Sequence, residues 1–246
     1  MGKYNQEDEI ADFFREQDAA LESEPEESKE QFELEEKVSR CTVLSKKYKQ
    51  MFLFLIGGAA LSIISTILSS IASNNADFYK QAKVFMIIIA AASAALSVCY
   101  GVFLLGLGRY HLDFKTAGLY YIISGASSAV SNSTTGKMQI TFQLLTAVFS
   151  VLYILKFAVA MSNSFDGVAP YMAVTWESYK KIFLYVYGAF VICLIACFLQ
   201  VMSVAALLLI FLSVAIIAIS IWQITLVLRS SQIMKQRAAA MQENYR

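Results

Sequence analysis

The stretch YKKIFLYVYGAF at residues 179–190 has two similar stretches earlier in the chain, FKTAGLYYIISG at 114–125 and YKQMFLFLIGGA at 48–59. Each begins with an aromatic residue and a Lys, and each places Leu and a second aromatic residue directly after three variable positions. An apolar segment follows in each case. The three stretches therefore predict three helices that enter a membrane from the same side.

The whole chain is too apolar for an ordinary soluble domain. Of its 246 residues, 57% are hydrophobic and 16% are charged, and the mean hydropathy is +0.55. Six segments are long enough to cross a hydrocarbon core of about 30 Å at about 1.5 Å per residue. We predict an all-α polytopic membrane protein of six transmembrane helices in three antiparallel hairpins, with spans near 51–72, 84–107, 116–132, 138–161, 182–202 and 204–228.

Two parts of this prediction have weaker signals. The third span is short and rich in Ser, Gly and Ala. The last two spans are separated only by the polar interruption from Gln200 to Ser203, where we expect a tight turn because one helix of that length would not fit a bilayer.

The positions of Lys and Arg predict the orientation. Twelve of them flank the spans on the side of the two termini, whereas the other side has only Lys80, Lys83 and Lys137. Basic residues concentrate on the cytoplasmic side of spanning helices, so we expect both termini in the cytoplasm. The membrane that we expect is the bacterial cytoplasmic membrane.

A second set of similar stretches lies in the even-numbered spans, with SVCY at 97–100, SVLY at 150–153 and SIWQ at 220–223. Together with the first set, these stretches are compatible with an internal triplication of one hairpin. The alternative is that an aromatic residue beside a Lys only anchors a helix at the headgroups, which any span favours. Both explanations stay open at this point.

The chain divides into an acidic leader (1–37), a transmembrane domain (38–229) and a basic cytoplasmic tail (230–246). The leader has 14 acidic and 4 basic side chains, a net charge of −10, while residues 38–246 have 5 acidic and 16 basic ones, a net charge of +11. We expect the leader to be mostly disordered, with a linker over ESEPEESKE at 22–30. From Phe32 onward, helical spacing of apolar residues predicts an extension of the first span.

Four apolar residues of the leader share one helix face: Ile10, Phe13, Phe14 and Leu21. The polar face of this short amphipathic helix is negatively charged, so anionic lipid would repel it. We therefore expect the helix to bind a cytoplasmic protein partner. The alternative is a solvated tail that binds nothing specific.

The spans lack the residues on which most membrane chemistry depends. No Asp, Glu or His lies within a predicted span, and the acidic residues beyond the leader fall in loops or the tail. Lys156 lies near a span end and is interpreted as an interfacial anchor, with a charge on a solute path as the alternative. His111 is predicted to be a solvated loop residue. Because no metal, cofactor or catalytic motif is present, we expect no enzyme, no cofactor and no metal site.

Hydroxyl and amide groups within the spans are the remaining candidates. The set in the third and fourth spans consists of Tyr121, Ser124, Ser128, Ser131 and Gln143. Such groups either line a solute path or let helices pack closely, and packing is the commoner role.

Two function classes follow from these patterns. The favoured one is a non-enzymatic, membrane-embedded interaction or scaffold protein that docks through its leader and through the predicted loop at 162–181. This loop exposes Tyr171 and Trp176, and the alternative for either residue is an anchor at the membrane interface. The alternative function class is a transporter or channel for a small neutral or hydrophobic solute. The lipid bilayer is an expected partner and nucleic acid is not, while a homo-oligomer is left open.

Overall fold

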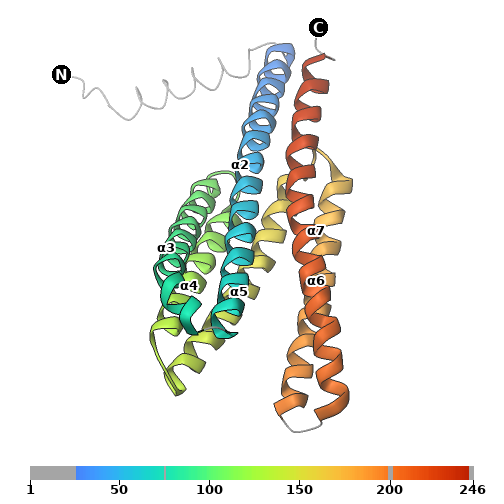
Figure 1. Ribbon diagram of the computed structural model, residues 1–246. Coiled ribbons are helices and arrows are strands. Elements are labelled where there is room, and N and C mark those ends of the chain that lie inside the picture. The colour runs from blue at the N-terminus through green and yellow to red at the C-terminus, as the bar shows by residue number, and fades with distance from the viewer. Residues whose placement is uncertain (1–25, 75, 199–201, 244–246) are drawn as a thin grey trace, which may run out of the picture. The chain divides into compact units, whose positions relative to one another are not determined.

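The computed structural model describes residues 26–74, 76–198 and 202–243, and within them the chain forms six α-helices and no strand (Figure 1). The prediction of an all-α fold is confirmed. The helices are α2 (Glu26–Asn74), α3 (Ala76–Leu107), α4 (Leu112–Ser133), α5 (Lys137–Ser164), α6 (Pro170–Phe198) and α7 (Met202–Glu243).

Each predicted span coincides with a different helix. Four helices have a stretch that is long and apolar enough to cross a membrane: Gln31–Ile71 in α2, Val84–Leu107 in α3, Lys137–Ser164 in α5 and Ile210–Glu243 in α7. α4 and α6 are not among these four. Of the predicted turn at 200–203, residues 200 and 201 lie outside the described residues, whereas Met202 and Ser203 belong to α7, which corrects the prediction for these two.

The first and last helices are much longer than a membrane requires. α2 has 49 residues and α7 has 42, which at about 1.5 Å per residue is at least twice the roughly 30 Å of hydrocarbon. The chain accordingly separates into two compact units: residues 46–233, and a smaller unit to which the described residues 26–45 and 234–243 belong. The expected extension of the first span is present.

The predicted linker at 22–30 is wrong from residue 26 onward, because α2 begins at Glu26, directly after Pro25. Charge alone does not prevent a helix when good helix formers such as Glu and Lys alternate along it. The Lys37 Nζ atom, for example, lies 3.4 Å from a carboxylate oxygen of Glu33, one turn earlier. Residues 1–25, with the candidate docking residues of the leader, lie outside the described residues.

Aromatic rings form the core of the larger unit. The first aromatic residue of each repeated stretch, namely Tyr48, Phe114 and Tyr179, is at most 1% exposed. A ring that anchors a helix at the headgroups would be accessible, so anchoring does not explain these three positions. Ring contacts run from Tyr48 through Phe114, Phe157 and Trp176 to Tyr179, with centroids 5.5–6.4 Å apart.

The predicted loop at 162–181 is mostly helical, which corrects the sequence analysis. α5 continues to Ser164 and α6 begins at Pro170, so only residues 165–169 connect them. Pro suits the first turn of a helix because its missing N–H needs no partner there. Tyr171 is 55% exposed as predicted, but Trp176 is completely buried and its indole N–H donates to Ser230 Oγ at 3.1 Å.

α4 lies against both α3 and α5, and its contact with α3 is unusually close. At Gly118 a Cβ atom would lie 2.8 Å from the carbonyl oxygen of Gly101 and 2.9 Å from the backbone nitrogen of Leu105. Only glycine lets the two backbones approach to this distance. By contrast, Leu53, Leu119 and Leu184 are about half exposed, as expected of side chains that face lipid.

Candidate functional site

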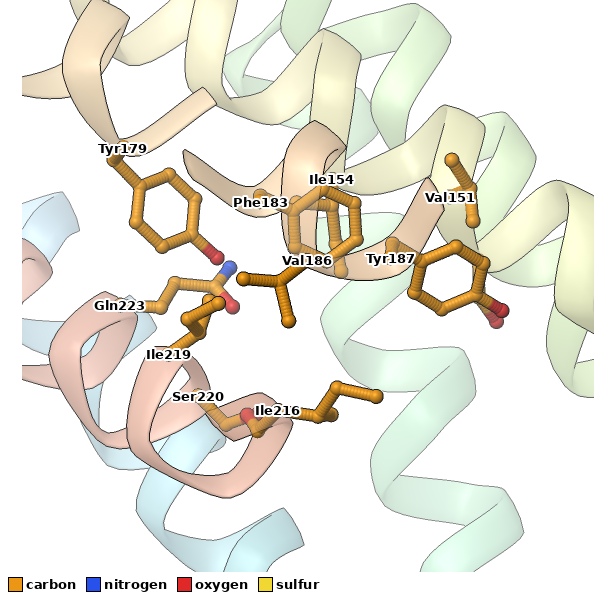
Figure 2. Close-up of a pocket in the computed structure, with 11 residues that line it drawn as sticks. Val151, Ile154, Tyr179, Phe183, Val186, Tyr187, Ile216, Ile219, Ser220 and Gln223 are labelled. Atoms are coloured by element: carbon orange, nitrogen blue, oxygen red, sulfur yellow. Dashed lines mark hydrogen bonds between the residues drawn. The ribbon is translucent and has the colours of Figure 1, made fainter. Parts of the chain in front are cut away.

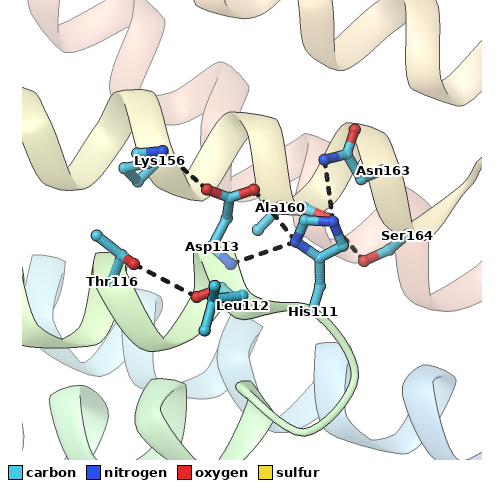
Figure 3. Close-up of polar contacts among 8 residues, drawn as sticks. All are labelled: His111, Leu112, Asp113, Thr116, Lys156, Ala160, Asn163 and Ser164. Atoms are coloured by element: carbon cyan, nitrogen blue, oxygen red, sulfur yellow. Dashed lines mark hydrogen bonds and ion pairs between the residues drawn. The ribbon is translucent and has the colours of Figure 1, made fainter.

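A cluster of polar side chains joins the start of α4 to the end of α5 (Figure 3). His111 is the N-cap of α4, where its Nδ1 atom accepts from the backbone N–H of Asp113 at 3.3 Å. The same Nδ1 atom is 3.2 Å from the Asp113 carboxylate, and Nε2 is 3.1 Å from the Asn163 amide nitrogen. Nδ1 accepts from the backbone when it is bare and donates to the carboxylate when it carries a proton.

The carboxylate of Asp113 also binds Lys156, whose Nζ lies 2.9 Å from Oδ1. The side chains of Asp113 and Lys156 are 19% and 45% exposed. The prediction that Asp113 lies in a loop is wrong, since it occupies the first turn of α4, and the solvated His111 is in fact a half-buried cap. A carboxylate in the first turn is favourable because the amide groups there are unpaired.

This cluster holds two helices together. The hydroxyl of Ser164, at the end of α5, donates to the Ala160 carbonyl of its own helix at 2.7 Å. Within the described residues, no group of three or more His, Cys, Asp or Glu side chains is placed to hold a metal ion. The arrangement therefore fits a structural tie between α4 and α5.

Two of the candidate serines of α4 face α5. Ser124 Oγ donates to the Thr146 carbonyl at 3.2 Å and lies 2.7 Å from Ser150 Oγ, and Ser131 Oγ donates to the Gln139 carbonyl at 3.4 Å. These bonds join α4 to α5 directly.

The other members of the candidate set are placed differently. Ser128 is half-buried, while Gln143 is exposed and is not brought together with Ser124 and Ser131. The ring of Tyr121 packs on the rings of Tyr100 and Tyr153, with centroids 4.9 and 4.8 Å away.

Tyr100 and Tyr153 form a buried pair that was not among the candidate residues. Their hydroxyl groups lie 2.9 Å apart, and the two side chains are 2% and 6% exposed. Both residues end the second set of repeated stretches, at 97–100 and 150–153. That repetition was the signal that could have identified them.

The smaller unit has an open groove between α2 and the end of α7. Its volume is about 500 Å³, and its lining combines apolar Leu34, Val38, Val43 and Met241 with a few polar groups that include Glu35. Cys41, Leu44, Met234 and Ala238 are buried in the same unit. Grooves with an apolar floor and a polar rim are typical of sites that bind an amphipathic helix.

Comparison of the chain with known protein families, with curated proteins and with solved structures gave no match.

Proposed function

We propose that this protein is a six-span membrane protein, with both termini in the cytoplasm, whose chain ends form a docking module for a cytoplasmic partner. The observation that carries the proposal is the smaller unit. α2 and α7 continue well past the length that a bilayer needs, and their extensions form a compact unit with an open apolar groove. A protein that only crossed the membrane would not need this unit. The role is non-enzymatic.

The partner that suits this module has a basic, amphipathic helix. Residues 1–45 and 234–246 together contain 15 acidic and 8 basic side chains, a net charge of −7. Opposite charge accelerates encounter and sets orientation, while the apolar floor at Leu34 and Val38 supplies affinity. Most of this charge belongs to the first part of the leader, since residues 1–25 have 8 acidic and 2 basic side chains, a net charge of −6. Its apolar face at residues 10–21 offers the same partner a second contact.

Cross-linking in native membranes tests the docking proposal. We would compare the proteins captured by the full chain, by a chain without residues 1–25 and by a Leu34→Asp/Val38→Asp variant. Phe32→Asp is the matched control, because Phe32 lies on the same helix, is 70% exposed and does not line the groove.

The expected result is a partner that the groove variant loses, that the shortened chain captures less well and that the control retains. Its capture should also weaken as salt rises, since exposed charges are screened beyond about 8 Å at physiological ionic strength. If all four chains capture the same proteins, or none, the docking proposal is overturned.

A six-span and a four-span topology place two connections between helices on opposite sides of the membrane. If α4 and α6 both cross, the turn at 134–136 is outside and the connection at 165–169 is cytoplasmic. If only α2, α3, α5 and α7 cross, both assignments reverse. We would treat intact cells that carry Thr135→Cys or Asp166→Cys, in a background without the native cysteines, with an impermeant maleimide. Labelling of the Thr135→Cys variant alone supports six spans, and labelling of the Asp166→Cys variant alone refutes them.

The same proposal includes three related hairpins. It is supported by the matching burial of Tyr48, Phe114 and Tyr179, and by the matching burial of Tyr100, Tyr153 and Gln223 at the ends of the second set of stretches. If equivalent positions have equivalent roles, Ala at any of the first three should lower the thermal unfolding temperature by a similar amount. A loss confined to one position would argue against the repeat.

A further inference from the structure

A small cavity lies between α5, α6 and α7 in the larger unit (Figure 2). Its volume is about 100 Å³, and Val, Ile and aromatic side chains provide most of its lining. Cavities with mostly apolar walls accept apolar groups, as one of about 150 Å³ lined by Leu, Ile and Phe accepts benzene. The space is therefore suited to a short length of aliphatic chain.

One polar side chain in the lining has a buried nitrogen without a hydrogen-bond partner. Gln223 of α7 is 8% exposed, and its Nε2 atom is fully buried without a hydrogen-bond partner among the described residues. Figure 2 shows this amide facing the Tyr179 hydroxyl at one end of the cavity. Because buried amide groups are nearly always paired, the Nε2 donors of Gln223 require an acceptor, and none of the described residues, the Tyr179 hydroxyl included, makes that hydrogen bond in this structure.

The repeated stretches show why the unpaired donor lies on the third hairpin. Gln223 stands at the position that Tyr100 and Tyr153 occupy in the other two. Those two hydroxyl groups pair with each other at 2.9 Å. Glutamine is less bulky than tyrosine, and the Nε2 atom of Gln223 makes no such hydrogen bond within the described residues. A Gln in place of a Tyr at this position therefore leaves both space and an unpaired donor.

The open side of the cavity determines where a ligand comes from. Ser220, also on α7, is exposed and lines it, and on a spanning helix an exposed residue faces lipid. Gln223 precedes Arg229 by six residues, or about 9 Å along the helix. With Arg229 at the headgroups, the amide lies just below the boundary between the headgroups and the hydrocarbon, which is the region of lipid ester groups.

From these observations we propose that the cavity binds an acyl group, with the start of its aliphatic chain in the apolar space and its carbonyl oxygen accepting a hydrogen bond from Gln223 Nε2. A diacyl phospholipid and a free fatty acid share this chemistry. The site needs only α7 to cross the membrane, so it does not depend on the docking module.

Photolabelling of the purified full-length protein in detergent tests the site. The probes are palmitic acid, a dipalmitoyl phospholipid and its di-O-alkyl analogue, each with a diazirine on the chain, and labelled residues are located by mass spectrometry. We expect acyl probes to label the cavity wall, for example at Val186 or Ile219. Stronger labelling by palmitic acid identifies a free fatty acid as the ligand, and stronger labelling by the diacyl lipid identifies a membrane lipid.

The variant that removes the donors is Gln223→Leu, which preserves most of the side-chain volume. It should weaken labelling by the acyl probes by about three- to tenfold, the range expected for one hydrogen bond. The di-O-alkyl analogue has no carbonyl, so it should label the natural protein as weakly as the acyl probes label Gln223→Leu. Gln143→Leu is the matched control, since Gln143 is an exposed glutamine on α5 outside the cavity, and it should label normally.

A measurement of stability distinguishes loss of binding from loss of folding. Because Gln223→Leu removes an unpaired buried amide, its thermal unfolding temperature should equal or exceed that of the natural protein. Equal labelling of the natural protein and Gln223→Leu, or equal labelling by ester and ether lipids, would overturn the proposal. Labelling at background level would show that the cavity holds at most water, and would overturn it as well.

Discussion

The close contact between α3 and α4 gives a prediction about one added methyl group. In Gly118→Ala the new Cβ atom would lie 2.8 Å from the Gly101 carbonyl oxygen, which is 0.6 Å less than the 3.4 Å at which ordinary contacts begin. Both of its nearest neighbours are backbone atoms, so no side chain can rotate away. The two helices must instead move apart.

The magnitude follows from two opposing effects. Extra volume in a packed interior usually lowers the free energy of unfolding by about 1–3 kcal/mol. Replacing Gly by Ala inside a helix raises it by up to about 1 kcal/mol. Gly106→Ala on α3 is the matched control, because Gly106 is exposed and a Cβ atom there would have no neighbour within 4 Å. The stabilisation from helix propensity is smaller at Gly106, which is one residue from the end of α3, so the difference between the two variants understates the crowding effect.

We expect Gly118→Ala to unfold about 2–12 °C below Gly106→Ala, at about 2–4 °C per kcal/mol for a chain of this size. The assay is thermal unfolding of the purified proteins in detergent, followed by circular dichroism at a helix wavelength. Equal unfolding temperatures for the two variants, or a higher one for Gly118→Ala, would refute the close approach of α3 and α4.

Three further experiments test other contacts by the same assay. Trp176→Phe removes the hydrogen bond to Ser230 and part of a fully buried ring, and should lower the free energy of unfolding by about 2–4 kcal/mol; a change below about 0.5 kcal/mol would contradict its burial. Tyr153→Phe leaves the Tyr100 hydroxyl unpaired and should lower it by about 1–3 kcal/mol. Adding Tyr100→Phe should then lower it little further, and additive losses would count against the pair. A double-mutant cycle with Asp113→Asn and Lys156→Met should give a coupling of about 1 kcal/mol or less, because Lys156 is 45% exposed; a coupling above about 3 kcal/mol would show that the pair is shielded from solvent.

The helices could be predicted from the sequence because their signal is local. A run of apolar residues long enough to cross a bilayer satisfies its own backbone only as a helix, so each predicted span lies in a separate helix. The repeated stretches also identified positions with matching burial, such as Tyr48, Phe114 and Tyr179. What these stretches did not reveal is that the rings lie inside the protein.

The contacts between helices could not be predicted, because they join residues that are far apart in sequence. Lys156 meets Asp113 across 43 residues, and Trp176 meets Ser230 across 54. A lysine near a span end and a tryptophan after a proline both have ordinary interfacial explanations. Only packing against another helix decides between burial and exposure, and a single sequence does not show which helix that is.

The orphan amide of Gln223 belongs to the same class of features. The sequence shows a glutamine within an apolar segment, which is compatible with packing or with a solute path. That its Nε2 atom lacks a partner depends on α5 and α6 together with α7.

The two tryptophans of the chain, Trp176 and Trp222, both touch the ring of Tyr179, with centroids 5.5 and 5.4 Å away. Both belong to the larger unit, and the smaller unit has none. Indole fluorescence therefore reports how α6 packs against its neighbours, and it does not report on the smaller unit. If the smaller unit melted first, helix content would fall while the emission stayed constant. The order in which the two units unfold can thus be recorded without attaching a dye.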